Sequence, residues 1–283
     1  MIAVKLEGRL GNQLFQYAFA YTAAKKLNTL FYLDKSIDPL LLSQYFNIER
    51  DFCAFFDDRI FSIQGFKVLF SHYARRNYYS FLRRLLSLQP VAFSDDLSPA
   101  IQLENLKNGC IYSGFFQSEQ YFESKKDTLR QLFTIKEEYQ KRFLPLFNSL
   151  PPASKYVTVH VRKGDYTNLN LALQPAYYHN AIKNIHNDDN FYIFVSDDPE
   201  FVKTGFAYLP NKYISENDTI TDLQFLINSD VCIISNSTFS WWGAWLNQKA
   251  EKNIYCPVYF MGKSKKKETP AGIYPDDWIQ IDY

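Results

Sequence analysis

The sequence predicts an α/β protein whose C-terminal half is a doubly wound, parallel sheet, and three observations support this prediction. Segments with the patterns of strands and helices alternate from residue 155 onward. Two of the strand segments, Phe191–Val195 and Val231–Ile234, are apolar throughout, as expected for strands that helices cover on both faces. A polar cluster follows each of three strand segments. Because ligands in such sheets bind beyond the carboxyl ends of the strands, these clusters are the candidate site.

The N-terminal part begins with a strand, a turn and a helix. Apolar residues alternate over residues 2–6, the turn Gly8-Arg-Leu-Gly-Asn-Gln13 follows, and a helix is expected from about residue 13 to residue 27. Glycines in such a turn let a ligand approach the backbone, and a helix N-terminus favours an anion. A tight structural turn explains the same residues equally well. The turn matches neither the dinucleotide fingerprint nor a P-loop.

The middle of the chain is less regular. Residues 34–99 are rich in Tyr, Phe and Arg and carry the pairs Arg75–Arg76 and Arg83–Arg84. The default interpretation is a solvated face of surface helices. The alternative is a surface that meets an anionic, lipid-linked or membrane-bound substrate. Residues 119–150 predict two helices broken near Thr134, and Pro151–Ser154 predicts a linker. We therefore expect an N-terminal lobe over residues 1–152 and a C-terminal lobe over residues 153–283.

The C-terminal half is regular. Strict alternation over Lys155–Arg162 predicts a strand that Gly164 ends, and Pro175 opens the next helix. Further strands are expected at 191–195, near 213, at 231–234 and at 254–256, with helices after 199, over 221–228 and after 238. The three polar clusters are His160/Arg162/Asp165, Ser196/Asp197/Asp198 and Ser235/Asn236/Ser237/Thr238. They are expected to line one rim of the sheet.

Two of these clusters have the chemistry of an anion site. Arginine grips phosphate through two parallel charge-assisted hydrogen bonds, and the alternative for Arg162 is a surface pair with Asp165. Ser237 and Thr238 lie at a predicted helix N-terminus, where hydroxyls and free backbone N–H groups suit a phosphate without a metal. Simple helix capping is the commoner explanation of such residues. The adjacent carboxylates of the remaining cluster either accept hydrogen bonds from a ligand or cap the following helix.

Composition narrows the classes of function. The chain has 283 residues, of which 47% are hydrophobic and 22% charged, and its formal net charge of +1 provides no bulk field that favours nucleic acid. It contains no Asp-x-Asp, and its 4 His lack metal-ligand spacing, so we expect no obligatory metal or other cofactor. The 4 Cys form no CxxC pair and are expected to be reduced. No signal peptide is evident, nor an apolar run of about 18 residues, so we expect a cytoplasmic protein, with the inner face of the membrane as an alternative.

The chain contains three motifs in this order: Gly8-Arg-Leu-Gly-Asn-Gln13, His160-Val-Arg-Lys-Gly-Asp-Tyr166 and Ser235-Asn-Ser-Thr-Phe-Ser-Trp-Trp-Gly-Ala-Trp245. Together they resemble glycosyltransferase family 11, the α-1,2-fucosyltransferases. Phe194–Asp198 and Pro275–Trp278 add to the likeness, which runs from about residue 2 to residue 281 and is weakest between 34 and 110. Lys163 stands where the family usually has a second Arg, and Arg9 where many bacterial members have Gly.

The resemblance implies a GT-B architecture, in which a cleft separates two Rossmann-like lobes. The N-terminal lobe would mainly bind the acceptor, and the C-terminal lobe would bind the nucleotide sugar. The implied reaction is metal-independent, inverting transfer of L-fucose from GDP-β-L-fucose to a sugar 2-hydroxyl, which forms an α-1,2 linkage. A galactoside in an oligosaccharide or lipid-linked surface glycan is the expected acceptor.

These expectations assign a role to each candidate residue. The expected catalytic residues are Arg162, Asn12 and Asp165. The expected donor-binding residues are Gly11, Asn12, His160, Arg162, Asp197, Asp198, Ser235, Asn236, Ser237, Thr238 and Phe239. Arg162 would bind the β-phosphate and the bridging oxygen, and Asn12 would close over the same leaving group from the other lobe. His160 and Asp198, or Asp197, would read the guanine or the ribose. Asp165 is proposed as the base, with the alternative that it only orients Arg162.

Two other classes of function stay open, a transferase that uses another GDP-sugar and a non-catalytic nucleotide- or sugar-binding module. A nucleotide hydrolase or kinase is disfavoured because the P-loop lysine is missing. Aromatic residues make up 18% of the chain and are expected to lie mainly in the core, Trp242 among them. Lys265–Lys267 predicts a solvated loop, with membrane contact as the alternative.

Overall fold

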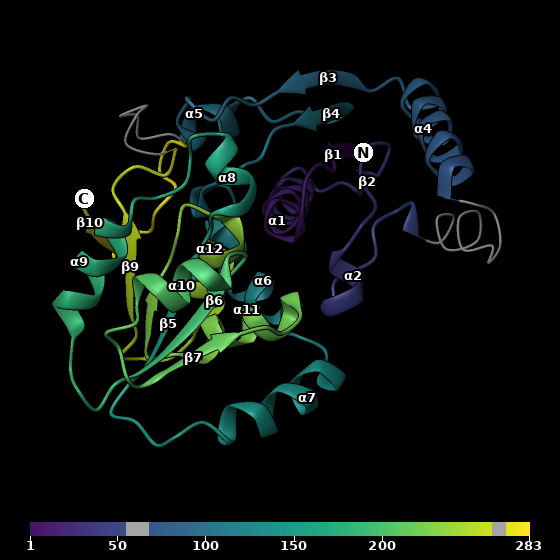
Figure 1. Ribbon diagram of the computed structural model, residues 1–283. Coiled ribbons are helices and arrows are strands. Elements are labelled where there is room, and N and C mark those ends of the chain that lie inside the picture. Colours follow the sequence, from purple (N-terminus) through teal and green to yellow (C-terminus); the bar gives the residue numbers. More distant parts are fainter. Residues whose placement is uncertain (55–67, 262–269) are drawn as a thin grey trace. The chain divides into compact units, whose positions relative to one another are not determined.

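A computed structural model describes residues 1–54, 68–261 and 270–283 (Figure 1). The chain forms two compact units, one from Met1–Thr134 with Pro270–Gly272 and the other from Ile135–Thr269 with Ile273–Tyr283. Each unit contains a parallel sheet with helices, which confirms the predicted α/β class. The predicted loop at Lys265–Lys267 lies outside the described residues.

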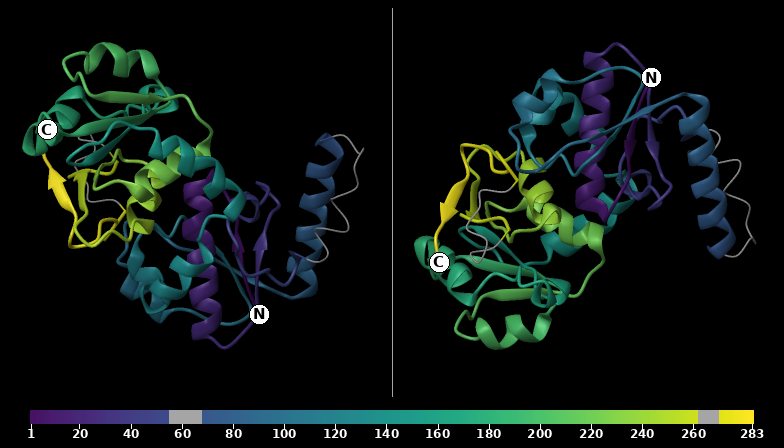
Figure 2. Two further views of the ribbon diagram at one scale, coloured as in Figure 1. Left: turned by 90° about the horizontal axis from the view of Figure 1, so that it is seen from below. Right: turned by 90° about the horizontal axis from the view of Figure 1, so that it is seen from above.

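Unit 1 is built on a parallel sheet with the strand order β2-β1-β4-β3. Its strands are β1 (Ile2–Lys5), β2 (Phe31–Asp34), β3 (Gln89–Ala92) and β4 (Cys110–Ser113). Helices α1 (Leu10–Lys26) and α4 (Val68–Leu85) cover opposite faces of this sheet (Figure 2). Alternation along β4 shows this directly, because Ile111 belongs to the cluster on the α4 side whereas the Tyr112 ring lies 5.6 Å from that of Phe19 on α1.

The remaining helices of unit 1 are short. They are α2 (Leu42–Tyr45), α5 (Pro99–Glu104), η1 (Glu119–Tyr121), η2 (Glu123–Lys125) and α6 (Lys126–Leu132). The first helix, α1, begins at Leu10, before the expected position near residue 13. The helix is buried on nearly every side, so it has no clear apolar face from which the sequence could predict its first residue.

Two buried ion pairs fix the carboxyl end of β2 in unit 1. Lys35 Nζ lies 3.1 Å from Asp51 Oδ2, and both side chains are buried. Asp34, fully buried, pairs with Arg83 in the last turn of α4 and also accepts a hydrogen bond from the Ser36 N–H. Buried charges of this kind are stable only when paired, so the Arg83–Asp34 contact ties the last turn of α4 to the end of β2.

Unit 2 is built on a parallel sheet with the strand order β10-β9-β8-β5-β6-β7. Its strands are β5 (Tyr156–Val161), β6 (Phe191–Ser196), β7 (Lys212–Ser215), β8 (Val231–Ile233), β9 (Asn253–Pro257) and β10 (Ile279–Ile281). Its helices are α7 (Glu137–Asn148), α8 (Gly164–Asn168), α9 (Pro175–Ile185), α10 (Pro199–Gly205), α11 (Thr219–Asn228) and α12 (Thr238–Leu246). Sequence analysis had not predicted α8 or β10.

The doubly wound arrangement of unit 2 follows from alternation along β6. Tyr192 and Phe194 lie in a core cluster with residues of α9 and α10, such as Tyr178 and Val202. Ile193 and Val195 lie in a separate cluster with residues of α7 and α11. Strand β6 is therefore covered on both faces, which explains its continuous apolar sequence.

Unit 2 begins earlier than the linker expected at Pro151–Ser154. Helix α7 was assigned to the N-terminal lobe, but it packs in unit 2. The ring of Phe143 lies 5.1 Å from that of Phe225, and the ring of Phe147 lies 5.1 Å from that of Tyr156. The chain therefore divides after Thr134, because burial of these aromatic rings ties α7 to the second sheet.

The aromatic residues lie largely in the core, as the composition predicted. Trp242 is fully buried, and Trp241 and Trp245 are buried with it. The Trp241 Nε1–H donates to the Ile273 carbonyl at 2.7 Å, so this indole holds the backbone near residue 273. All 4 cysteines are buried and none of them forms a disulfide. None of the helices in the described part of the chain is long and apolar enough to cross a membrane.

The packing of α12 on α11 gives a test of the fold. A Cβ at Gly243 would lie 2.5 Å from Leu226 Cβ and 2.7 Å from Leu226 Cδ1. We expect Gly243→Ala to destabilise the protein by about 1–3 kcal/mol, seen as a lower Tm in a thermal melt. Gly205→Ala is the matched control, because a Cβ there meets nothing closer than 4.0 Å. Equal Tm values for the two variants would contradict this account of the helix contact.

Candidate functional site

The three polar clusters of unit 2 lie at the ends of neighbouring strands. Strand β5 pairs with β6 on one side and β8 on the other, and Val161 stands opposite Ser196 in the register. The residues that follow these strands therefore share one rim, as the sequence predicted. Sequence spacing alone separates these clusters by tens of residues, and only the parallel strand order brings them together.

Arg162 is held at this rim between two carboxylates. Its Nη2 lies 2.6 Å from Asp165 Oδ1, and its Nη1 lies 2.8 Å from Asp197 Oδ2. The guanidinium carbon also lies 5.4 Å from the centre of the Tyr166 ring. The side chain is 18% exposed, so the guanidinium is fixed in direction and still reaches solvent. A guanidinium has more N–H donors than these two pairs use, and it can therefore bind an additional anion.

Asp197 also organises the backbone beneath Arg162. Its Oδ1 accepts a hydrogen bond from the Lys163 N–H at 2.8 Å. A Cβ on Gly164 would lie 2.7 Å from Asp197 Oδ2, so the carboxylate reaches Arg162 because residue 164 is glycine. The Lys163 ammonium lies 3.9 Å from the centre of the Phe201 ring.

His160 lies behind the rim and joins two strands. Its Nδ1 is 2.7 Å from Ser235 Oγ, and both side chains are buried. Burial, and then the Arg162 charge, lower the pKa of His160 to about 3. The imidazole is therefore neutral at physiological pH, and its hydrogen bond fixes the end of β8 against the end of β5. Phe239, whose ring centre lies 5.5 Å from that of His160, packs beside this pair.

The segment before α12 is extended and well anchored. Asn236 Nδ2 donates to the Leu171 carbonyl at 2.9 Å, and Tyr166 Oη donates to the Asn236 carbonyl at 3.3 Å. Ser237 is the N-cap of α12 with φ −121° and ψ 131°, yet its side chain makes no capping hydrogen bond. The first N–H groups of an α-helix point out of its N-terminus, so Ser237 and Thr238 border a group of aligned donors.

The Asp198 carboxylate caps a helix. Its Oδ1 accepts a hydrogen bond from the Phe201 N–H at 3.0 Å, at the start of α10. Capping was the alternative to ligand recognition that the sequence left open for this residue. Asp165, similarly, takes the alternative geometry, in which it orients Arg162.

Asp222, which sequence analysis did not single out, adds a carboxyl group near the end of β7. Ser215 Oγ lies 2.5 Å from its Oδ1. Burial and the nearby Asp218 charge raise the pKa of Asp222 to about 7, against the effect of the Ser215 hydrogen bond. A titratable carboxyl group at such an edge is typical of functional sites. The sequence signal was weak because Asp222 lies inside a helix, seven residues after the strand ends.

In unit 1, the turn before α1 is also held firmly. Gly8 has φ +88°, and its N–H donates to Asp38 Oδ2 at 2.7 Å. Asn12 Oδ1 accepts a hydrogen bond from Gln117 Nε2 at 3.3 Å. A Cβ on Gly8 would lie 2.5 Å from Asn12 Nδ2, so glycine is needed both for the backbone angle and for Asn12. Gly11 is buried in the first turn of α1, and Arg9 is exposed.

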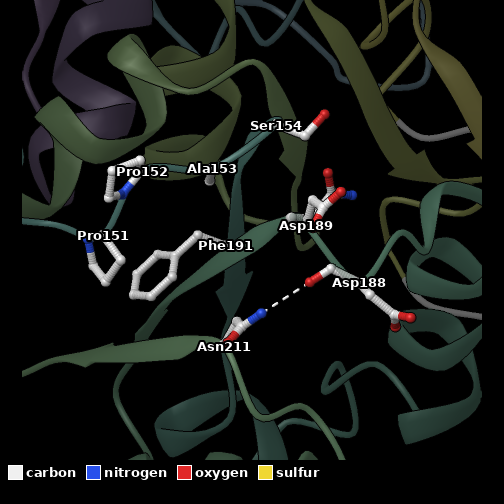
Figure 3. Close-up of a pocket in the computed structure, with 9 residues that line it drawn as sticks. Pro151, Pro152, Ala153, Ser154, Asp188, Asp189, Phe191 and Asn211 are labelled. Carbon is white, nitrogen blue, oxygen red and sulfur yellow. Dashed lines mark hydrogen bonds between the residues drawn. The ribbon is translucent and has the colours of Figure 1, made fainter.

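A pocket of about 460 Å³ lies elsewhere in unit 2, at the amino ends of β5 and β6 (Figure 3). Its lining includes Pro151, Asp188, Asp189 and Asn211. Asn211 Nδ2 donates to the Asp188 carbonyl at 2.8 Å, whereas the Asp188 carboxylate is fully exposed. This pocket is at the opposite end of the strands from Arg162 and contains no convergent set of charged groups.

Comparison with known proteins identifies the family. The profile of Glycosyl transferase family 11 matches residues 1–282. The chain belongs to this family. It is 29% identical to the O-antigen biosynthesis glycosyltransferase WbnK of Escherichia coli, with 98% of this chain and 99% of WbnK aligned. It is also 29% identical to an alpha-1,2-colitosyltransferase of Escherichia coli, with 100% of this chain and 99% of that protein aligned.

Solved structures of other glycosyltransferases share the fold of this family 11 member. A mutant of Arabidopsis thaliana FUT1 in complex with GDP matches with a TM-score of 0.54 at 12% identity, covering 90% of this chain and 70% of that chain. NodZ alpha-1,6-fucosyltransferase co-crystallized with GDP matches with a TM-score of 0.53 at 14% identity, covering 86% and 91%. The fold is thus the GT-B architecture that the sequence resemblance implied.

The Asp222 carboxyl group gives a test in the pH dependence of stability. Its pKa of about 7 in the folded protein exceeds the value of about 4 expected in the unfolded chain, so folding favours the protonated form. The resulting stabilisation is complete below about pH 4 and is lost as the pH rises through 7. Asp222→Asn does not titrate and keeps an oxygen for Ser215. We expect it to be more stable than the native protein at pH 8, by about 1–2 kcal/mol, and to lose this advantage toward pH 5.

The measurement is Tm by calorimetry across this pH range. Glu251→Gln is the control, because that side chain is exposed. A constant difference in Tm between Asp222→Asn and the native protein at pH 5 and pH 8 would contradict the raised pKa.

Proposed function

We propose that this protein transfers L-fucose from GDP-β-L-fucose to the 2-hydroxyl of a galactoside and forms an α-1,2 linkage. The observation that carries the proposal is the fixed guanidinium of Arg162 on the same rim as the N-terminus of α12, in a chain that matches family 11 over its length. A relative named as an alpha-1,2-colitosyltransferase and a fold shared with fucosyltransferases that bind GDP support the linkage and the nucleotide. A relative named for O-antigen biosynthesis supports a surface glycan, free or lipid-linked, as the acceptor.

The proposed reaction inverts the anomeric centre. As the bond from the sugar to the β-phosphate breaks, the sugar gains oxocarbenium character and the departing phosphate gains negative charge. In a metal-independent reaction, fixed donors must stabilise that charge. Arg162 is assigned to the β-phosphate and the bridging oxygen. Ser237, Thr238 and the first N–H groups of α12 are assigned to the phosphate oxygens.

The remaining roles are assigned from the hydrogen bonds and ion pairs that each residue makes in the structure. Asp197 positions Arg162 and is proposed, with Asp198, to face the nucleoside. His160 is neutral and buried, so its proposed contribution to donor binding is to support Ser235. Asn12 is proposed to bind the donor from unit 1. Asp165 is proposed as the base, although its ion pair with Arg162 favours the orienting role. A pH–rate profile of Asp165→Asn that keeps the native basic limb would eliminate it as the base.

A second candidate donor is GDP-colitose, which the 29% identical colitosyltransferase favours. Colitose differs from L-fucose only in lacking the 3-hydroxyl group, so the same phosphate site serves both donors. Assays with the two GDP-sugars on a panel of galactosides decide between them. Calorimetric titration with GDP in EDTA tests the nucleotide site separately. Transfer from neither sugar, together with metal-free GDP binding, would overturn both donor assignments and leave the phosphate site in place.

Removal of the Arg162 guanidinium is the direct test of the phosphate site. Loss of one donor to a developing oxyanion commonly lowers turnover by about 10²–10³. We expect Arg162→Ala to reach this loss and to weaken GDP binding in calorimetry. Arg162→Lys keeps the charge but not the two-pronged geometry, so it should recover binding more than turnover. Near-normal turnover of Arg162→Ala, in a variant with native Tm, would refute the assignment.

The contact between Gly164 and Asp197 gives a separate test. Gly164→Ala should displace the Asp197 carboxylate from Arg162 and lower turnover about tenfold through poorer orientation. Asp197→Asn should have a similar effect. Because both changes act on one ion pair, their double variant should lose no more than either single variant. If the fold-loss in turnover of the double variant equals the product of the two single losses, Gly164 does not act through Asp197.

A further inference from the structure

The outward face of α4 in unit 1 exposes large apolar side chains. Tyr73, Phe81 and Leu85 are 68%, 62% and 65% exposed. With about 100° between successive helical residues, these three lie within roughly a third of the circumference. Two exposed arginines, Arg76 and Arg84, border the same strip. Apolar side chains grouped on an exposed face mark an interaction surface.

The inward face of α4 is fully used by the fold. Tyr79 and Leu82 are buried against the sheet, and the ring of Tyr79 stacks on that of Tyr32 at 6.1 Å. The pair of Arg83 with buried Asp34 fixes the last turn. The helix therefore holds its outward face in one orientation, and Tyr73, Phe81 and Leu85 do not belong to the core cluster beneath.

The charge of α4 indicates what this face contacts. The helix contains Arg75, Arg76, Arg83 and Arg84, and its sequence has no Asp or Glu, whereas the whole chain carries a net charge of only +1. The helix therefore carries a local excess of positive charge, even though Arg83 is paired with Asp34. Arginines beside aromatic and leucine side chains are typical of helices that lie in the interface of an anionic bilayer.

We propose that the outward face of α4, defined by Tyr73, Arg76, Phe81, Arg84 and Leu85, docks on an anionic lipid surface. The aromatic and leucine side chains enter the boundary between headgroups and acyl chains, and the arginines bind lipid phosphates. A second copy of the chain fits this face poorly, because an isologous contact would oppose the arginines of one copy to those of the other. The proposal does not depend on which sugar the protein transfers.

Co-sedimentation with vesicles tests the charge requirement. The full chain is expected to bind vesicles that contain phosphatidylglycerol, to ignore vesicles of phosphatidylcholine alone, and to dissociate as salt rises. Each arginine near an anionic surface contributes about fivefold in affinity, so Arg76→Glu with Arg84→Glu should weaken binding at least roughly 30-fold. Lys107→Glu with Lys183→Glu is the matched control, since it changes net charge equally at exposed positions outside α4.

Fluorescence tests the insertion of the apolar strip. All 4 native tryptophans are buried, so a tryptophan placed at the surface reports its own contact with lipid. Phe81→Trp should be quenched by brominated lipids in anionic vesicles. Tyr208→Trp, at a position 56% exposed in unit 2, should not be quenched. Transfer to a soluble acceptor should be unchanged in all of these variants, which separates loss of docking from loss of activity.

Three results would overturn the proposal. Equal binding to neutral and anionic vesicles would remove the charge argument. Unchanged binding in the Arg76/Arg84 double variant, or equal quenching at positions 81 and 208, would place the contact elsewhere. A dimer in lipid-free solution that Leu85→Ser dissociates would assign this face to a second copy of the chain.

Discussion

The pairing of Arg162 with two carboxylates is the interaction on which the rest of the C-terminal unit depends. A guanidinium that is 18% exposed has lost much of its hydration, and Asp165 and Asp197 replace that hydration with direct ion pairs. The Asp197 pair requires that β6 lie beside β5, because Asp197 follows the end of β6, whereas Asp165 comes from the same segment as Arg162. The Asp197 pair also requires Gly164, since a Cβ there would lie 2.7 Å from the Asp197 carboxylate.

Much of this unit is predictable because its sequence changes character where each strand ends. Apolar runs such as Phe191–Val195 are covered by helices on both faces, and polar residues follow because the rim is open to solvent. The Pro151–Ser154 linker misled the domain assignment, because a local signal for a break carries no information about the rings of Phe143 and Phe225. The buried environment of Asp222 could not be predicted from the sequence either, since it depends on how the fold brings Asp222 to Ser215.

Helix α4 was poorly predictable for a related reason. A periodic pattern reveals a helix when apolar residues lie on one face only. In α4 they lie on both, with Tyr79 and Leu82 against the sheet and Phe81 and Leu85 facing outward. With apolar residues on both faces, the sequence does not show the one-sided periodicity that predicts a surface helix. Phe81 and Leu85, which break that periodicity, are also the side chains that make the outward face apolar.

The charges on the rim bear on the proposed role of Arg162. The formal charges of Arg162, Lys163, Asp165 and Asp197 cancel, and His160 adds none because burial keeps it neutral. In the proposed reaction, the diphosphate of the donor would bind the N–H donors of Arg162 that the two carboxylates do not use. The aligned N–H groups of α12 would add to this attraction, because that helix has no acidic residue in its first turn. The two carboxylates would thus keep the guanidinium in position while its remaining donors bind the phosphate.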